Sequence, residues 1–221
     1  MNERDEGLVT VDAAGVALEG NLIVPDGATG VVIFAHGSGS SRFSSRNRFV
    51  AEVLREGGIG TLLIDLLTAS EEMVDTRTAR LRFDIPLLAE RVAGTTEWMR
   101  AQHPHLRIGL FGASTGAAAA LAAAARLPEA VKAVVSRGGR PDLADDALPR
   151  VEAPTLLIVG GEDGPVIGMN EEALARLACT KKLEIVPGAG HLFEERGTLE
   201  QAAGLASAWF TRFLAAQNDV S

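Results

Sequence analysis

Apolar residues along this chain gather into short runs that end in glycine, proline or polar residues, which is the pattern of buried β-strands. Near the N-terminus, Leu8 to Asp12 and Val16 to Val24 alternate apolar and polar positions around Ala-Ala-Gly, and this pattern predicts a β-hairpin. The buried-strand candidates farther along the chain are Val31–His36, Thr61–Leu66, Arg107–Phe111, Val131–Ser136, Thr155–Gly160 and Lys182–Val186.

Helical patterns separate these strand candidates. They lie near Arg46–Glu56, Ile85–Gln102, Ala117–Leu127, Gly168–Ala178 and Leu199–Ala216. Strands that alternate with helices need crossover connections, so we predict an α/β fold with a mostly parallel central sheet and helices on both faces. There is no long linker and no internal repeat, and we expect residues 1–221 to form a single domain. In such sheets ligands bind beyond the carboxyl ends of the strands.

One strand–helix junction carries the sequence Gly-x-Ser-x-Gly, with Ser114 at its centre. An apolar run precedes the motif, and residues 117–126 have almost uninterrupted helix propensity. This order is what a nucleophile elbow requires, because a sharp strand-to-helix turn exposes the serine at its apex. Gly112 and Gly116 lack a Cβ, which allows the strand and the helix to approach closely. We therefore predict that Ser114 is a nucleophile.

A serine nucleophile needs a general base, and the chain has four histidines. His191 follows the last predicted strand in Pro-Gly-Ala-Gly-His, where a loop can carry its imidazole over the sheet edge toward Ser114. His36 ends a strand and is interpreted as a structural residue that braces the following loop. His103 and His105 flank a proline in a polar connection without nearby carboxylates or cysteines, so we expect surface residues rather than a metal site.

The base in turn needs a carboxylate that fixes its tautomer. Asp163 follows a predicted strand, and the chain order Ser114, Asp163, His191 is the one expected of an α/β-hydrolase. Asp65 and the Asp142–Asp146 segment also follow strands and remain alternatives to Asp163.

An oxyanion hole should complete the site. We expect its donors to be the backbone N–H of Thr115, directly after the nucleophile, and that of Ser38 in the glycine–serine loop over residues 36–41. That loop lacks the lysine of a P-loop and the Gly-x-Gly-x-x-Gly pattern, so nucleotide binding is not expected.

Composition excludes several classes of partner. The net charge of −8 argues against nucleic acid and anionic membranes, which select basic surfaces. The polar N-terminus and the absence of an apolar run of ~20 residues predict neither a signal peptide nor a membrane span. The single cysteine, Cys179, excludes an intramolecular disulfide, and we expect a cytoplasmic protein.

Taken together, these segments resemble the α/β-hydrolase superfamily, and within it the capless dienelactone-hydrolase-like group. The nearest resemblance is to bacterial hydrolase domains that occur alone or joined to a phosphoribosyltransferase domain. The residues that carry it are Phe34–Arg42, Arg46–Arg48, Asp65–Thr68, Leu81–Ile85, Gly112–Gly116 and His191–Glu195. The resemblance implies a serine hydrolase that works through an acyl-enzyme without metal or organic cofactor. Dienelactone hydrolase itself uses a cysteine nucleophile, whereas Ser114 occupies the elbow here, so dienelactone is not the expected substrate.

The predicted function is cleavage of small carboxylic esters or lactones. A thioesterase or acyl transferase, and a non-catalytic binding protein with this fold, are the alternatives, and a homodimer is an open question. The segment Leu67–Arg82 is a candidate partial lid, too short for a cap domain. Arg42 and Arg137 both follow strands and are expected to reach the carboxyl edge of the sheet near Ser114, where they would favour esters that bear a carboxylate.

Overall fold

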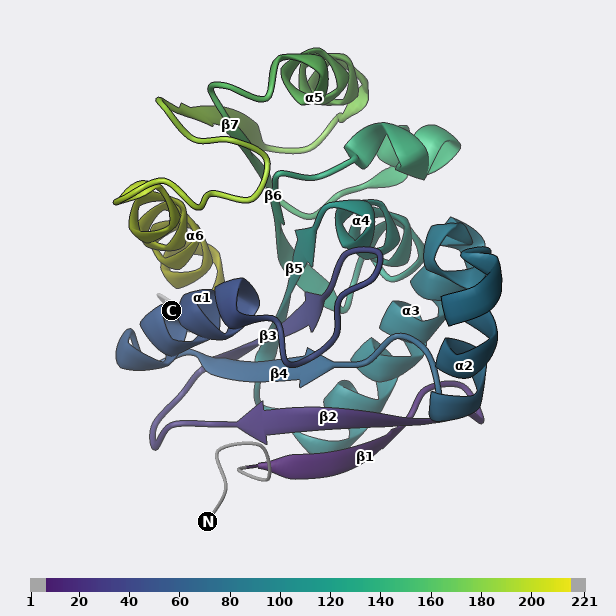
Figure 1. Ribbon diagram of the computed structural model, residues 1–221. Helices are drawn as coiled ribbons and strands as arrows, with labels where there is room; N and C mark the ends of the chain where they lie inside the picture. The colour runs from purple at the N-terminus through teal and green to yellow at the C-terminus, as the bar shows by residue number, and fades with distance from the viewer. Residues whose placement is uncertain (1–6, 216–221) are drawn as a thin grey trace.

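The computed structural model describes residues 7–215, and its strands join in one eight-stranded sheet (Figure 1). The strands are β1 (Leu8–Asp12), β2 (Ala17–Ile23), β3 (Gly30–Ala35), β4 (Gly60–Ile64), β5 (Arg107–Ala113), β6 (Val131–Arg137), β7 (Thr155–Gly160) and β8 (Lys181–Val186). Their order across the sheet is β1-β2-β4-β3-β5-β6-β7-β8. The β1–β2 and β2–β4 pairs are antiparallel, and all the other pairs are parallel. The mostly parallel sheet predicted from the sequence is confirmed.

Helices cover both faces of this sheet. They are α1 (Ser45–Glu56), α2 (Ala69–Thr78), α3 (Ile85–Gln102), α4 (Thr115–Arg126), α5 (Gly164–Arg176) and α6 (Thr198–Leu214), with 3₁₀ turns over Leu81–Phe83 and Pro141–Arg150. In Figure 1, α1 and α6 lie side by side on one face, while α3 and α4 lie on the other. Alternate side chains of β3 show why two cores form: Val31 and Ile33 pack toward α3 and α4, whereas Val32 and Phe34 pack toward α1 and α6.

Helix α4 lies unusually close to the sheet at its first turn. Its alanines from Ala117 to Ala120 are fully buried, so no long side chain separates the helix from the strands. A Cβ at Gly116 would lie 2.2 Å from the carbonyl oxygen of Ala35, and one at Gly112 would lie 2.3 Å from the Cα of Ala117. Such distances are far inside van der Waals contact, so both positions need glycine.

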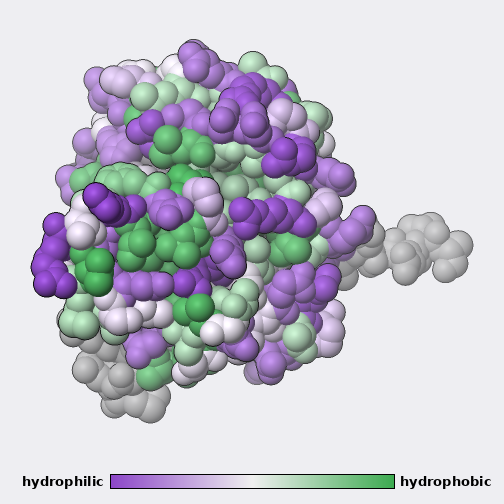
Figure 2. Space-filling view, turned by 90° about the vertical axis from the view of Figure 1, so that its right-hand side faces the viewer, coloured by the Kyte–Doolittle hydropathy of each residue, from purple (hydrophilic) through white to green (hydrophobic). Residues whose placement is uncertain are grey.

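The segment after β4 differs most from the sequence expectation. Residues 67–82, expected only as a partial lid, contain helix α2 and part of a 3₁₀ turn, and they form no cap domain. Thr68 and Glu71 make a capping box at the start of α2, while Ala79 ends the helix with a positive φ. Figure 2 shows the face on which α2 and α3 lie, where hydrophobic patches sit among hydrophilic residues. The exposed apolar residues of this segment are Met73 and Val74, and Phe83 follows directly after it.

Helix α5 begins at Gly164, four residues before the predicted start near residue 168. Pro165 stands in its first turn, where the fixed φ of proline favours the start of a helix. Within residues 7–215, no helix is both long and apolar enough to cross a membrane.

The close approach of α4 gives a test of the fold. We expect Gly116→Ala to lower the free energy of unfolding by about 2–4 kcal/mol, because its Cβ would meet two backbone carbonyls, of Ala35 and His36, that cannot move independently. Gly204→Ala in α6 is the matched control, since no atom lies within 4 Å of its Cβ position. That control should be neutral or stabilising by up to about 1 kcal/mol. Urea unfolding measures both, and equal midpoints for Gly116→Ala and wild type would contradict the packing argument.

Candidate active site

Ser114 occupies the sharp turn between β5 and α4. Its backbone has φ 51° and ψ −124°, a conformation that L-residues rarely adopt and that costs on the order of 1–3 kcal/mol. The turn is held by its own carbonyl, which accepts hydrogen bonds from the N–H groups of Ala117 at 3.1 Å and Arg140 at 3.0 Å. The Ser114 side chain makes no capping bond to α4, so its hydroxyl is available to a neighbouring base.

Asp163 and His191 form a hydrogen-bonded pair beside Ser114. The Nδ1 of His191 lies 2.7 Å from the Oδ2 of Asp163. Asp163 is the N-cap residue of α5, but its carboxylate makes no capping bond and turns to the imidazole instead. With Nδ1–H donating to the carboxylate, the lone pair of Nε2 is left for another proton. His191 and Ser114 line the same cavity, whose volume is about 250 Å³.

The loop that carries His191 is fixed from two sides. The Glu162 N–H donates to the carbonyl of Ala189 at 2.9 Å, which ties the Asp163 turn to this loop. Glu195 accepts the N–H of Gly190 at 3.0 Å, and this backbone hydrogen bond lowers the pKa of the Glu195 carboxyl. Sequence reasoning included Glu195 only in a family motif, because a side chain that folds back onto its own loop leaves no periodic signal.

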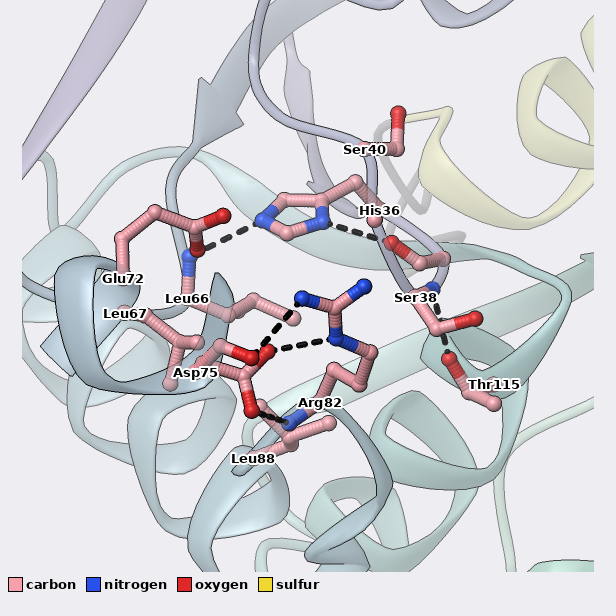
Figure 3. A pocket seen from close by; sticks show the side chains of 12 residues that line it. His36, Ser38, Ser40, Leu66, Leu67, Glu72, Asp75, Arg82, Leu88 and Thr115 are labelled. Carbon is pink, nitrogen blue, oxygen red and sulfur yellow. Dashed lines mark hydrogen bonds and ion pairs between the residues drawn. The ribbon is translucent and has the colours of Figure 1, made fainter. Parts of the chain in front are cut away.

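The glycine–serine loop after β3 packs against the elbow. A Cβ at Gly37 would lie 2.9 Å from the Cβ of Ser114, so the loop backbone runs directly beside Ser114. The Ser38 N–H, expected in the oxyanion hole, donates to the Oγ1 of Thr115 at 2.9 Å (Figure 3). To serve an oxyanion, this N–H has to be shared with the threonine hydroxyl or released from it.

His36 anchors the same loop and has no free ring nitrogen (Figure 3). Its Nδ1–H donates to the carbonyl of Gly37 at 2.9 Å, and its Nε2 accepts the N–H of Leu66 at 3.1 Å. Burial lowers the pKa of this imidazole, which keeps it neutral. The predicted structural role of His36 is confirmed.

Arg42 lies away from the cavity that Ser114 lines. Its guanidinium pairs with Asp65 and, at 2.7 Å, with Glu19, while its backbone N–H donates to Asp65 at 2.7 Å. The other alternative acids are also engaged by arginines. Arg140 holds Asp142 through two bonds of 2.9 and 2.8 Å, and Asp145 and Asp146 face Arg176.

Arg137, the other arginine predicted from the sequence, lines the cavity with Ser114 and is only 6% exposed. Its Nη2 donates to the Oδ1 of Asn47 at 3.2 Å. Its Nε and Nη1 have no hydrogen-bond partner among the residues that the structure describes. Burial, with a smaller contribution from the like charge of Arg46, lowers the pKa of Arg137 to about 10. Arg46 lines the same cavity and was not predicted as a site residue. The Arg46–Arg48 segment contributed only to the family resemblance, and a place on the first turn of a helix indicates no chemical role by itself.

Helix α2 packs next to the glycine–serine loop rather than over Ser114. Asp75, buried near the end of α2, accepts a hydrogen bond from the Leu81 N–H at 2.7 Å. It also accepts one from Arg82 Nε at 2.5 Å (Figure 3). The Nη1 of Arg82 would lie 3.4 Å from a Cβ at Gly39. None of the described residues that line the Ser114 cavity comes from 67–82.

No group of histidines, cysteines and acids within residues 7–215 has the arrangement of a metal site.

Comparison with known proteins gives consistent results. The model of the dienelactone hydrolase family matches residues 18–217. A dienelactone hydrolase structure from Anabaena variabilis is 61% identical, with a TM-score of 0.93 over 96% of this chain and 99% of that one. Est1E from Butyrivibrio proteoclasticus shares the fold at 16% identity, with a TM-score of 0.79 over 96% of this chain and 100% of that one.

Two curated relatives, each a putative phosphoribosyl transferase from a strain of Mycobacterium tuberculosis, are 56% identical over 209 residues. The match takes in 94% of this chain but 46% of each relative, so the chain spans about half the length of these proteins.

The backbone strain at residue 114 can be measured by comparing the stabilities of two variants. We expect Ser114→Gly to be more stable than Ser114→Ala by about 1 kcal/mol, because glycine adopts this positive φ readily while alanine keeps the strain; the entropy that glycine loses on folding offsets part of the gain. For a chain of this size the difference corresponds to about 2–4 °C in Tm. Calorimetry of the two variants decides, and a Tm for Ser114→Gly at or below that of Ser114→Ala would refute the strain.

Proposed function

This chain belongs to the dienelactone hydrolase family, and we propose that it is a serine hydrolase that cleaves small carboxylic esters or lactones through an acyl-enzyme. Family membership supports hydrolysis as the reaction class. The observation that carries the finer proposal is the hydrogen bond between Asp163 and His191 at the cavity that Ser114 lines. The chain carries a candidate for each of the three triad roles, and this supports catalysis over a purely binding role.

In the proposed mechanism, the Ser114 oxygen attacks the substrate carbonyl carbon while Nε2 of His191 takes the hydroxyl proton. Asp163 stabilises the imidazolium that forms. The N–H groups of Thr115 and Ser38 would donate to the oxygen that becomes negative. When the tetrahedral intermediate collapses, His191 gives its proton to the leaving alcohol and the acyl group stays on Ser114. Water then attacks the acyl-enzyme with the same base, which releases the acid and restores the serine.

The size of the site supports small substrates. The cavity of about 250 Å³ lies below the usual range of drug-sized pockets, roughly 300–1,000 Å³. Helix α2 adds no side chain to it, so the acyl group would be held by the loops after β3, β5 and β6. The same residues permit thioester cleavage or acyl transfer, but no contact favours either. The transferase name of the relatives describes proteins of twice the length, and we do not extend that activity to this chain.

The nucleophile can be tested directly. Ser114→Ala should lower the turnover of short-chain aryl esters by on the order of 10⁴-fold or more, because the covalent step is lost. A fluorophosphonate probe should modify Ser114 in the wild type, as shown by peptide mass spectrometry. Ser207→Ala in α6 is the control and should remain both active and labelled at Ser114. Labelling of another serine, together with full activity of Ser114→Ala, would exclude the proposal.

The proposed role of the Asp163 carboxylate in catalysis can be tested without unfolding the protein. Asp163→Asn keeps the side-chain shape but offers His191 no charge, so kcat should fall by on the order of 10⁴-fold while the Tm changes little. In the wild type, kcat/KM should fall toward acid pH, since a protonated imidazole cannot accept the serine proton. Asp142→Asn serves as the matched control and should keep normal kinetics. Full activity of Asp163→Asn would instead assign the role to Asp65 or the 142–146 segment.

A further inference from the structure

The cavity beside Ser114 contains positive charge that the protein does not neutralise. Arg137 is buried at its wall, and two of its three guanidinium nitrogens have no hydrogen-bond partner within residues 7–215. Phe193, whose ring centroid lies 5.7 Å from the Arg137 Cζ, offers only a weak cation–π contact. Among the described residues that line the cavity there is no aspartate or glutamate. A buried guanidinium without a carboxylate is unfavourable unless a ligand supplies the negative charge.

A second cation faces the same space. Arg46 lines the cavity, and it is close enough to Arg137 to contribute to the lowered pKa of that group. The acidic partner of Arg46 is Glu194, at 3.3 Å, and the Glu194 side chain is 66% exposed. An ion pair so open to water is worth little, so an incoming anion can replace Glu194 readily.

The N-terminus of α1 also points to this cavity. Its N-cap Ser44, with Arg46 and Asn47 from the first turn, forms part of the lining. The first N–H groups of a helix have no intrahelical acceptor, and the helix dipole places partial positive charge there. The helix is 12 residues long, and its cap is the neutral hydroxyl of Ser44, which accepts the Asn47 N–H at 3.3 Å. The first turn carries no acidic side chain, so no negative charge there offsets the helix dipole. Helix N-termini of this kind bind phosphate and other oxyanions.

We propose that this end of the cavity binds a phosphoryl group on the substrate, at a distance from the ester bond that Ser114 attacks. Arg46 and the first turn of α1 would donate to the phosphoryl oxygens, and Arg137 would supply charge from the cavity wall. The inference rests on the proposed esterase function and adds a substrate class to it. The sequence predicted Arg42 and Arg137 as the arginines that contact the substrate. The proposal assigns this role to Arg46 and Arg137, because Arg42 is paired with Asp65 and Glu19 away from the cavity.

Phosphate fits this site better than carboxylate for reasons of charge and geometry. The positive charge of two guanidinium groups and a helix N-terminus is larger than the single negative charge of a carboxylate. A phosphate monoester carries nearly two negative charges and so matches it better. The donors come from separate elements, α1 and the end of β6, and three tetrahedral oxygens can accept from separate directions where two coplanar oxygens cannot.

Three acetate esters that differ in one group test the proposal: para-acetoxyphenyl phosphate, para-acetoxybenzoate and para-methoxyphenyl acetate. Each kcat/KM is divided by the rate of alkaline hydrolysis of the same ester, which removes differences in leaving group. This normalised kcat/KM should be about 10- to 100-fold higher for the acetate that bears a phosphate than for the neutral acetate, because charge-assisted hydrogen bonds hold the phosphate. It should also be higher than the value for the acetate that bears a carboxylate. A phosphate ester no better than the neutral one, or inferior to the carboxylate, would overturn the proposal.

Variants assign the effect to residues. Arg46→Gln should lower the ratio of phosphate to neutral ester about tenfold, and Arg137→Gln should lower it too, provided that its Tm shows a folded protein. Arg48→Gln is the matched control: it removes the same charge from the same helix, at a residue that packs on Phe43, and should leave the ratio unchanged. An unchanged ratio in Arg46→Gln contradicts the proposal even if Arg137→Gln does not fold. Equal losses for both esters in a folded Arg137→Gln would also contradict it and would assign Arg137 to the oxyanion.

Failure of the esterase function itself is recognised separately. If the wild type cleaves none of the three esters, titration calorimetry with phenyl phosphate on wild type, Arg46→Gln and Arg48→Gln decides the phosphoryl site alone. Binding that is lost in Arg46→Gln and kept in Arg48→Gln supports the site, whereas no binding to the wild type rejects it.

Discussion

The contact on which the rest of this structure depends is the approach of α4 to the backbone of β3 and β5. Gly116 lies so close to the carbonyls of Ala35 and His36 that no other residue fits, and Gly112 is equally close to Ala117. That approach forces the turn at Ser114 into its unfavourable dihedral angles. It also brings the glycine–serine loop after β3 against Ser114, so one packing contact positions both the Ser114 turn and this loop. Because main-chain atoms make the contact, the geometry is insensitive to side-chain motion.

Charge is distributed around this contact in two different ways. Most buried or half-buried arginines of the described chain are held by carboxylates, as in the pairs Arg42–Asp65, Arg82–Asp75, Arg91–Glu71 and Arg140–Asp142. These pairs fasten α2 and the loops around the sheet edge. Arg137 stands at the cavity, and two of its guanidinium nitrogens have no hydrogen-bond partner among the described residues. In a chain of net charge −8, this cavity is a local region of positive charge, and the proposed anionic substrate would bind there despite the overall charge.

The strands and the elbow were predictable because their signals are local. A buried run of five or six apolar residues, or glycines that flank a serine between a strand and a helix, can be read without knowing the partners. The pairing of Asp163 with His191 followed from chain order on a known sheet topology. The sequence did not predict helix α2, because this helix has almost no apolar face. A capping box holds its start, and Asp75 near its end accepts a hydrogen bond from Leu81, which lies beyond the helix. The Arg42 side chain points toward Glu19, which is distant in sequence, and no local sequence pattern predicts this pairing.

His36 makes the loop beside Ser114 sensitive to acid. Both its ring nitrogens are committed, one as donor to Gly37 and one as acceptor from Leu66, so protonation in the folded state must break the bond to Leu66. Burial lowers its pKa, and the unfolded chain, with an ordinary histidine pKa near ~6.5, takes up the proton first. This contribution to stability is therefore complete above that value and is lost as the pH falls below it. Protonation of His36 would therefore loosen the loop that carries Ser38 from Leu66, which directly follows β4, and would change the wall of the Ser114 cavity without any change in the cavity's other residues.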